Sequence, residues 1–295
     1  MSRNNADRLG LDENTPDDGG AAAATAAVEG GSQGLSFSMP TEHVELPSGG
    51  AFYPERHPLH NQETIEIKYM TAKEEDILTS PSLIKKGLTV ERLLRSVIID
   101  KTIDPQHLLV GDRNAIIIAS RLTGYGPEYK AQTTCPMCLT QASWEVNLAD
   151  LKVSSGGVDC SDGYNVKVGK NVGEYDITVP KTNIIVTVRL LTGRDEFAIS
   201  ERTRKRKKHT QEETNLVTQM KSMIVAVNGG RKDSDVEKLS EFLPAFDSRY
   251  IRNAYAKINP NLDMKYPFEC QSCDHEDTME VPLTAEFFWP KGGAR

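Results

Sequence analysis

The chain has 295 residues, of which 38% are apolar and 26% are charged, a composition typical of a soluble globular protein. Its formal net charge is −7, and no apolar run approaches the roughly 18 residues that a membrane span requires. No basic segment followed by an apolar core opens the sequence. We therefore expect no secretory signal and no membrane partner.

The first 38 residues differ in composition from the rest of the chain. They carry six acidic and two basic side chains, a net charge of −4. Residues 21–27 are almost all alanine, but glycine pairs flank them and seven residues are too few to sustain an isolated helix. We predict a disordered, acidic, Ala/Gly-rich tail over residues 1–38, which either aids solubility or orders on a partner.

The sequence next predicts a strand, with alternating apolar and polar residues, that leads into a helix. A similar strand–helix junction occurs a second time later in the chain. Residues 64–75 resemble residues 185–196, since each stretch alternates like a strand and then continues as Thr-x-basic-acidic-Glu. Thr71 with Glu74 fits a capping box, and Thr192 with Asp195 is a weaker version of it. The apolar positions 93, 94, 97 and 98 form a helical stripe downstream of the first junction.

Two CxxC pairs, Cys135/Cys138 and Cys270/Cys273, lie in segments that align without a gap. A shift of 135 residues places residues 112–151 on residues 247–286 with nine identities, and both cysteine pairs are among them. After each pair, apolar residues alternate with polar ones at matching distances, which is typical of a half-buried strand. We expect each CxxC pair at the tip of a β-hairpin.

Between the two similar segments, residues 152–176 are rich in Gly, Ser and Asp. This composition predicts a connecting loop with at most one strand up to Gly173. Further on, Leu216, Met220, Met223, Ile224 and Val227 have helical spacing, and the glycine pair after Asn228 should end that helix.

These patterns predict an α+β protein built from an internally duplicated strand–helices–CxxC hairpin unit. We place the first repeat at residues 44–151, the connecting loop at 152–176 and the second repeat at 177–290. The two CxxC hairpins should together form one zinc ribbon.

Four thiolates are the ligand count of a structural Zn²⁺ site, and they leave no open position for catalysis. We therefore predict that Cys135, Cys138, Cys270 and Cys273 bind one structural Zn²⁺. A redox dithiol is an alternative because Cys-Pro-x-Cys occurs in oxidoreductases, although those place the first cysteine at a helix N-terminus. Two independent half-sites, completed by another chain or by His275, are a further alternative. Cys160 is left over as an incidental thiol.

No sequence pattern of a catalytic centre is present, including the serine-hydrolase, metalloprotease and phosphate-loop motifs. We therefore expect no enzymatic activity and no small-molecule substrate. One basic run indicates a different function, because six cations in seven residues can neutralise phosphates. It comprises Arg202, Arg204, Lys205, Arg206, Lys207 and Lys208. Against nucleic acid stand the acidic net charge and the lack of interleaved aromatic residues, so an acidic protein partner is equally compatible.

Several short motifs resemble the baseplate proteins of T-even-type contractile-tailed bacteriophages. The resemblance spans residues 44–151, about a third of the chain, and extends more loosely over the second half. Its motifs are Leu-Pro-Ser-Gly-Gly-Ala-Phe-Tyr-Pro from Leu46, Lys68-x-Met70-Thr71 with Glu74-Glu75, Asp112-Arg113, Arg121-x-x-Gly-Tyr-Gly, and Tyr129 followed by Cys135-Pro-x-Cys138. The acidic N-terminal tail departs from the family pattern.

The resemblance implies a structural or assembly role in the baseplate or its central hub, without enzymatic activity. It also implies that other baseplate and hub proteins are the partners, with nucleic acid as the weaker alternative. The expected location is the tail baseplate of the virion, assembled in the host cytoplasm.

Overall fold

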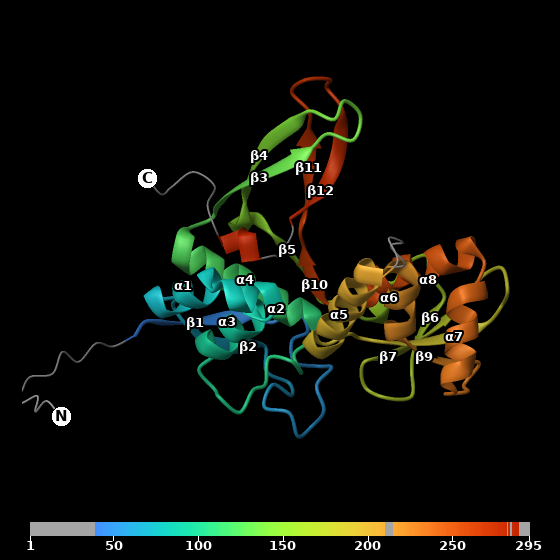
Figure 1. Ribbon diagram of the computed structural model, residues 1–295. Coiled ribbons are helices and arrows are strands. Elements are labelled where there is room, and N and C mark those ends of the chain that lie inside the picture. Colours follow the sequence, from blue (N-terminus) through green and yellow to red (C-terminus); the bar gives the residue numbers. More distant parts are fainter. Residues whose placement is uncertain (1–38, 210–214, 282, 284, 289–295) are drawn as a thin grey trace, which may run out of the picture. The chain divides into compact units, whose positions relative to one another are not determined.

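The computed structural model describes residues 39–209, 215–281, 283 and 285–288 (Figure 1). Over this part the chain combines helices with strands, as the sequence predicts. The predicted tail, residues 1–38, lies outside the described residues. Within the described part, none of the helices combines the length and the apolar character that crossing a bilayer would take.

The first half begins with a two-stranded antiparallel sheet, in which Thr41 pairs with Lys68 and Glu45 with Thr64. Four helices follow the second strand. The elements are β1 (Thr41–Glu45), β2 (Thr64–Lys68), α1 (Ala72–Thr79), α2 (Pro81–Lys86), α3 (Thr89–Val97) and α4 (Val110–Tyr125). The apolar stripe predicted near residue 93 is the buried face of α3, since Leu93, Leu94 and Val97 are all fully buried.

The second half contains a four-stranded antiparallel sheet in the order β6-β7-β8-β9. Its strands are β6 (Val166–Val168), β7 (Glu174–Thr178), β8 (Ile185–Arg189) and β9 (Ile224–Val227). The helices of this half are α5 (Gly193–His209), α6 (Asn215–Met223), α7 (Asp233–Phe242) and α8 (Ala245–Ile258).

Two β-hairpins and one short strand pair complete the fold. The hairpins are β3 (Glu128–Thr134) with β4 (Gln141–Asn147), and β11 (Lys265–Glu269) with β12 (Glu276–Glu280). The short pair is β5 (Lys152–Ser154) with β10 (Asn261–Asp263). Among the described residues, 3-10 turns lie at Leu148–Asp150, Val158–Cys160 and Ala285–Phe288. The β5–β10 pair joins the chain that leaves the first hairpin to the chain that enters the second.

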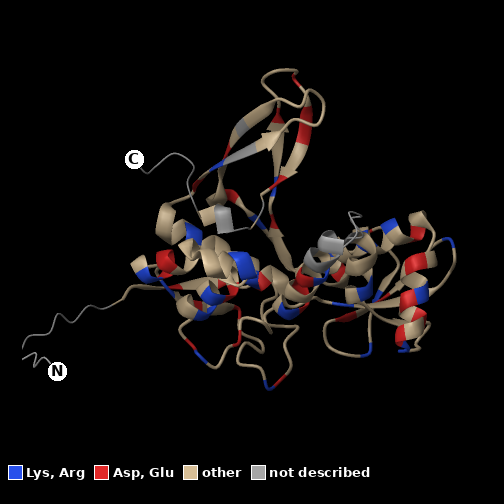
Figure 2. Cartoon of the chain, in the orientation of Figure 1, with Lys and Arg blue, Asp and Glu red and all other residues tan. Residues whose placement is uncertain are grey.

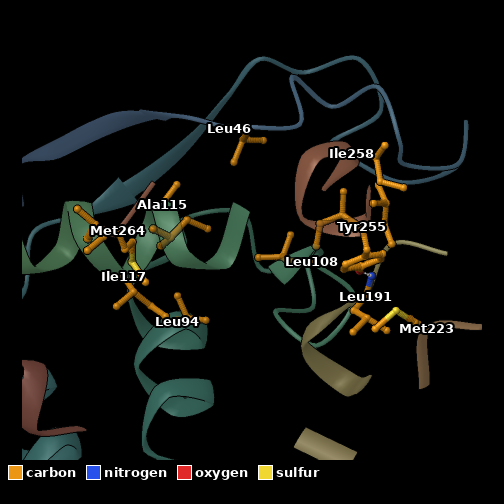
Figure 3. Packing of buried hydrophobic residues seen from close by; sticks show 14 of the residues in the cluster. Leu46, Leu94, Leu108, Ala115, Ile117, Leu191, Met223, Tyr255, Ile258 and Met264 are labelled. Carbon is orange, nitrogen blue, oxygen red and sulfur yellow. Dashed lines mark hydrogen bonds between the residues drawn. The ribbon is translucent and has the colours of Figure 1, made fainter. Parts of the chain in front are cut away.

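Buried residues from both halves belong to one hydrophobic cluster. Figure 3 shows part of it, including Leu94 and Ile117 from the first half and Leu191, Tyr255 and Ile258 from the second. The two halves therefore share a core instead of folding around separate ones.

Two strand ends and the helices that follow them have the same side-chain arrangement. The last residue of β2 and of β8 is basic and pairs with an acid in the first turn of the next helix, at 2.6 Å in both cases. A threonine directly before each helix donates to the same acid from its backbone N–H and its hydroxyl. The residues are Lys68, Thr71 and Glu74 at α1, and Arg189, Thr192 and Asp195 at α5.

Helices α4 and α8 also start alike. Asp112, in the first turn of α4, accepts hydrogen bonds from the backbone N–H and the hydroxyl of Ser48 at 3.0 and 2.6 Å. Asp247, in the first turn of α8, accepts from the backbone N–H groups of Lys181 and Thr182 and from the Thr182 hydroxyl, at 2.8–3.0 Å. Each aspartate thus connects the start of its helix, by hydrogen bonds, to loop residues that follow a proline in the sequence.

The structure corrects two of the predicted segments. The helix expected over residues 216–227 ends at Met223, and Ile224–Val227 forms strand β9 instead. Helical spacing continues to Val227, but three of the last four residues are β-branched, which favours a strand. The strand that they form pairs with β8 at the edge of the sheet. The stretch at 152–173, predicted to be a loop with at most one strand, contains two strands, β5 and β6.

Candidate metal centre

Each CxxC pair lies in the turn of a β-hairpin, and the two turns match in length. Thr134 pairs with Gln141 across the first turn, and Glu269 pairs with Glu276 across the second, so six residues form each turn. The two hairpins also contact each other away from their turns, since the rings of Trp144 and Tyr266 lie 6.0 Å apart (Figure 1).

The backbone hydrogen bonds of the two turns are the same. In the first, the Cys135 N–H donates to the Thr140 carbonyl at 2.9 Å and the Leu139 N–H donates to the Cys135 carbonyl at 3.0 Å. In the second, the Cys270 N–H donates to the His275 carbonyl and the Asp274 N–H to the Cys270 carbonyl, both at 2.9 Å. These bonds fold each turn tightly and aim both of its sulfurs to one side.

All four cysteine sulfurs come together. The four Sγ atoms lie within 4.8 Å of one another, and the Cys135–Cys273 and Cys138–Cys270 sulfurs are 3.7 Å apart. A tetrahedral ion with Zn–S bonds of about 2.3 Å holds its sulfurs about 3.8 Å apart. A disulfide requires about 2.05 Å, and all of these cysteines are free thiols. The spacing therefore fits a metal ion bound by four sulfurs.

Burial of the cluster is unequal. Cys135 and Cys270 are fully buried with Phe268, while Cys138 and Cys273 are exposed. The partly buried side chains of Ala142, Trp144 and Met279 pack around this small apolar cluster. It shields one side of the sulfur cluster from water and leaves the other side open for entry of an ion.

The pKa values of Cys138 and Cys273 are shifted in opposite directions. The hydroxyl and the backbone N–H of Thr140 donate to Cys138 and lower its pKa to about 6. The His275 backbone N–H lowers the pKa of Cys273, but burial and the other three thiols outweigh it and raise that pKa to about 12. Four sulfurs at this spacing cannot all ionise without a cation, so metal binding must displace protons.

The structure places the other sequence-predicted cysteine and histidine outside this cluster. Cys160 lies in the 3-10 turn Val158–Cys160 and is not among the grouped thiols. The nearest acidic partner of the His275 ring is Asp277, with Nε2 3.9 Å from its carboxylate. The alternative of a half-site completed by His275 is not the arrangement found, because the two cysteine pairs complete each other.

The basic run at residues 202–208 occupies the C-terminal part of α5. Arg202 is exposed, and the side chains of residues 204–208 lie outside the described part. Whether this run contacts a partner therefore stays a prediction.

Sequence reasoning overlooked the residue that follows each CxxC pair. Leu139 and Asp274 both adopt left-handed backbone conformations, with φ of 60° and 55°. The ungapped alignment already placed Leu139 opposite Asp274, and aspartate is common in this conformation whereas leucine is not. That contrast was the available signal.

Comparisons with known proteins give one match. A family model described as T4 bacteriophage base plate protein matches residues 39–289. No curated protein and no solved structure matches the chain.

Proposed function

This chain belongs to the family of T4 bacteriophage base plate proteins, and we propose that it is a structural or assembly component of a phage tail baseplate or its central hub. The observation that carries the proposal is the family match, which spans residues 39–289 and so covers both halves and both hairpins. In this role the protein acts through contacts with other tail proteins, without catalysis, and it joins the virion tail during assembly in the host cytoplasm.

We propose further that the four clustered cysteines bind one structural Zn²⁺, which makes the two hairpins a zinc ribbon. Sulfur spacings of 3.7 Å support a tetrahedral ion, and the four-sulfur donor set is one that zinc prefers. Since the ion would join turns that are more than 130 residues apart in the chain, it would hold both hairpins in one rigid body.

An internal duplication is the third part of the proposal, with repeats at residues 44–151 and 177–290 joined by residues 152–176. The matched helix starts support it. Thr71 and Thr192 make the same contacts at α1 and α5, and Asp112 and Asp247 each accept backbone and hydroxyl hydrogen bonds from a loop at α4 and α8. The matched turns around the two CxxC pairs support it as well. A duplicated unit presents two related faces, which suits a subunit that contacts several neighbours.

Deleting this gene from its phage and examining the lysate by negative-stain electron microscopy tests the proposed role. We expect filled heads without complete baseplates or tails, and restoration of tails when the wild-type gene is supplied from a plasmid. Normal infectious particles from the deleted phage would overturn the role. They would favour the alternative of a nucleic-acid-binding ribbon protein that uses residues 202–208, whose affinity for nucleic acid should fall steeply with salt.

A further inference from the structure

The two knuckles, defined here as residues 135–140 and 270–275, have the same backbone conformation but different surfaces. The first presents Pro136, Met137 and Leu139, and the last two are 72% and 75% exposed. The corresponding positions of the second are Gln271, Ser272 and Asp274. One tip is therefore apolar and the other polar on the same scaffold.

Leu139 is costly to the isolated protein in two ways. Its side chain is mostly exposed to water, although burying an apolar side chain lowers the free energy. Its φ of 60° belongs to the left-handed region, where a leucine Cβ crowds the following carbonyl and Asn, Asp or Gly fit better. Leucine at this position lowers neither the free energy of hydration nor the backbone energy of the knuckle. We therefore expect this side chain to have a role in a contact.

The surroundings of the apolar tip are acidic. From Tyr266 to Glu280 the second hairpin contains no Lys or Arg, and the first contains none from Ala131 to Asn147. Exposed acids crowd the second hairpin, and Figure 2 shows acidic residues along β12. The exposed acids of this hairpin are Glu269, Asp274, Glu276, Asp277 and Glu280. The cysteines beside Leu139 and Asp274 belong to the one sulfur cluster, so the apolar tip lies at the same end of the hairpin pair as Asp274 and the turn-flanking Glu269 and Glu276.

We infer that the first knuckle inserts Met137 and Leu139 into an apolar pocket of another baseplate protein, and that Lys or Arg side chains surround that pocket. The inference rests on the proposed baseplate function. Apolar anchors in a desolvated pocket carry most of the binding energy of an interface, and complementary charge around them orients the partner. A second copy of this chain is not the occupant, because joining two such tips would bring the two sets of acids together.

The proposed zinc ion would add rigidity to this contact. Together with the backbone bonds of the turn, an ion bound by the four clustered sulfurs would hold the tip in one conformation before the partner arrives. A preorganised tip loses little conformational entropy on docking, so two side chains can contribute a large share of the affinity.

The variant Leu139→Asn separates docking from folding. Asparagine tolerates the left-handed conformation, so the purified full-length variant should keep its metal content and a Tm equal to or a few degrees above that of the wild type. The control is Ser272→Asn, which places the same residue at an exposed position of the other tip and leaves every acid in place. We expect a plasmid-borne Leu139→Asn gene to restore at least about 30-fold fewer infectious particles to the deleted phage than wild type. Ser272→Asn should restore nearly all of them.

Restoration of particles by Leu139→Asn at the wild-type level would overturn the inference and leave the proposed function intact. If the deleted phage already produces normal particles, the proposed function fails first and the inference fails with it. The two failures are therefore distinguishable.

Photo-crosslinking gives a second, independent readout. A benzophenone amino acid at position 137 should form an adduct with another tail protein in assembled tails, at a peptide that combines apolar residues with Lys or Arg. The same probe at position 272, on the polar tip, should form none. An absence of adducts from position 137, or adducts only to another copy of this chain, would contradict the inference.

Discussion

Glu74 is a fully buried carboxylate whose contacts offset the cost of its burial. The Lys68 ammonium lies 2.6 Å from one of its oxygens, and the Ser96 hydroxyl donates to the same oxygen. Thr71 donates twice to the other oxygen. Burial raises the pKa of Glu74, but these hydrogen bonds outweigh it and lower the pKa to about 2. One side chain thereby joins β2, the start of α1 and α3.

The low pKa of Glu74 predicts a specific dependence of stability on pH. A carboxyl whose folded-state pKa lies below its usual value of 4.5 stabilises the fold above pH 4.5, and the stabilisation is lost as the pH falls toward 2. Glu74→Gln should therefore cost about 2 kcal/mol at pH 7, and the difference from wild type should shrink below about pH 4.5. Urea unfolding over a series of pH values measures this.

Asp76→Asn is the control for that series, because Asp76 lies on the same helix but is exposed. It should change the free energy of unfolding by less than about 0.5 kcal/mol at any pH. A pH-independent difference between Glu74→Gln and wild type would show that the charge of Glu74 is not the stabilising feature.

At the scale of elements, the packing of α4 on the backbone just before and within β10 connects the two halves. An added Cβ at Gly111 would lie 1.9 Å from the carbonyl oxygen of Pro260. One turn later, the Asn114 side-chain amide donates to the Asn261 side chain at 3.1 Å. Only a glycine at the start of α4 permits the two backbones to approach so closely.

Gly111→Ala should therefore be strongly destabilising, by about 3 kcal/mol or more, because neither backbone can move without disturbing the shared core. Gly124→Ala, on the same helix, is the matched control. There an added Cβ would meet only the flexible end of Met70, at 2.4 Å from its Cε. We expect the control to stay within about 1 kcal/mol of wild type. Equal thermal stability of the two variants would contradict the close approach.

At the scale of the whole molecule, the sulfur cluster closes a loop that contains the connecting segment and most of the second half. Cys135 and Cys273 are separated by 138 positions in the sequence. Closing so long a loop restricts the unfolded chain, and the free energy of metal binding adds to that of folding. One shared ion would thus couple the stability of the first hairpin to that of the second.

A shared ion predicts that Cys135→Ser and Cys270→Ser have the same effect, although they lie in different hairpins. Each should remove the single zinc per chain and lower the Tm, and the double variant should be no worse than either single one. Metal analysis of the purified protein and thermal unfolding measure both effects. Cys160→Ser is the control and should retain zinc and Tm, because Cys160 lies outside the cluster. Retention of stoichiometric zinc by either single variant, or loss of half of it, would contradict one shared site.

Features that depend on local chemistry could be predicted from the sequence alone. Cysteine spacing within each turn, alternation in the flanking strands and the threonine–acid pairs at helix starts are set by residues that are neighbours in the chain, so they could be recognised before any coordinates. The baseplate resemblance rested on such short motifs, and the family match agrees with it at the level of the baseplate family.

Features that depend on contacts between distant residues are set by the tertiary fold and do not follow from local patterns. Helical spacing over residues 216–227 did not predict that Ile224–Val227 would pair with β8. A segment becomes an edge strand only when a neighbouring strand, distant in the sequence, lies beside it. Likewise, the meeting of four sulfurs within 4.8 Å depends on how the β5–β10 pair and the shared core direct both hairpins to one place. The left-handed backbone at Leu139 follows from the closed turn, not from the preference of leucine. Local sequence patterns therefore identified the four candidate ligands, whereas the tertiary fold brings them together.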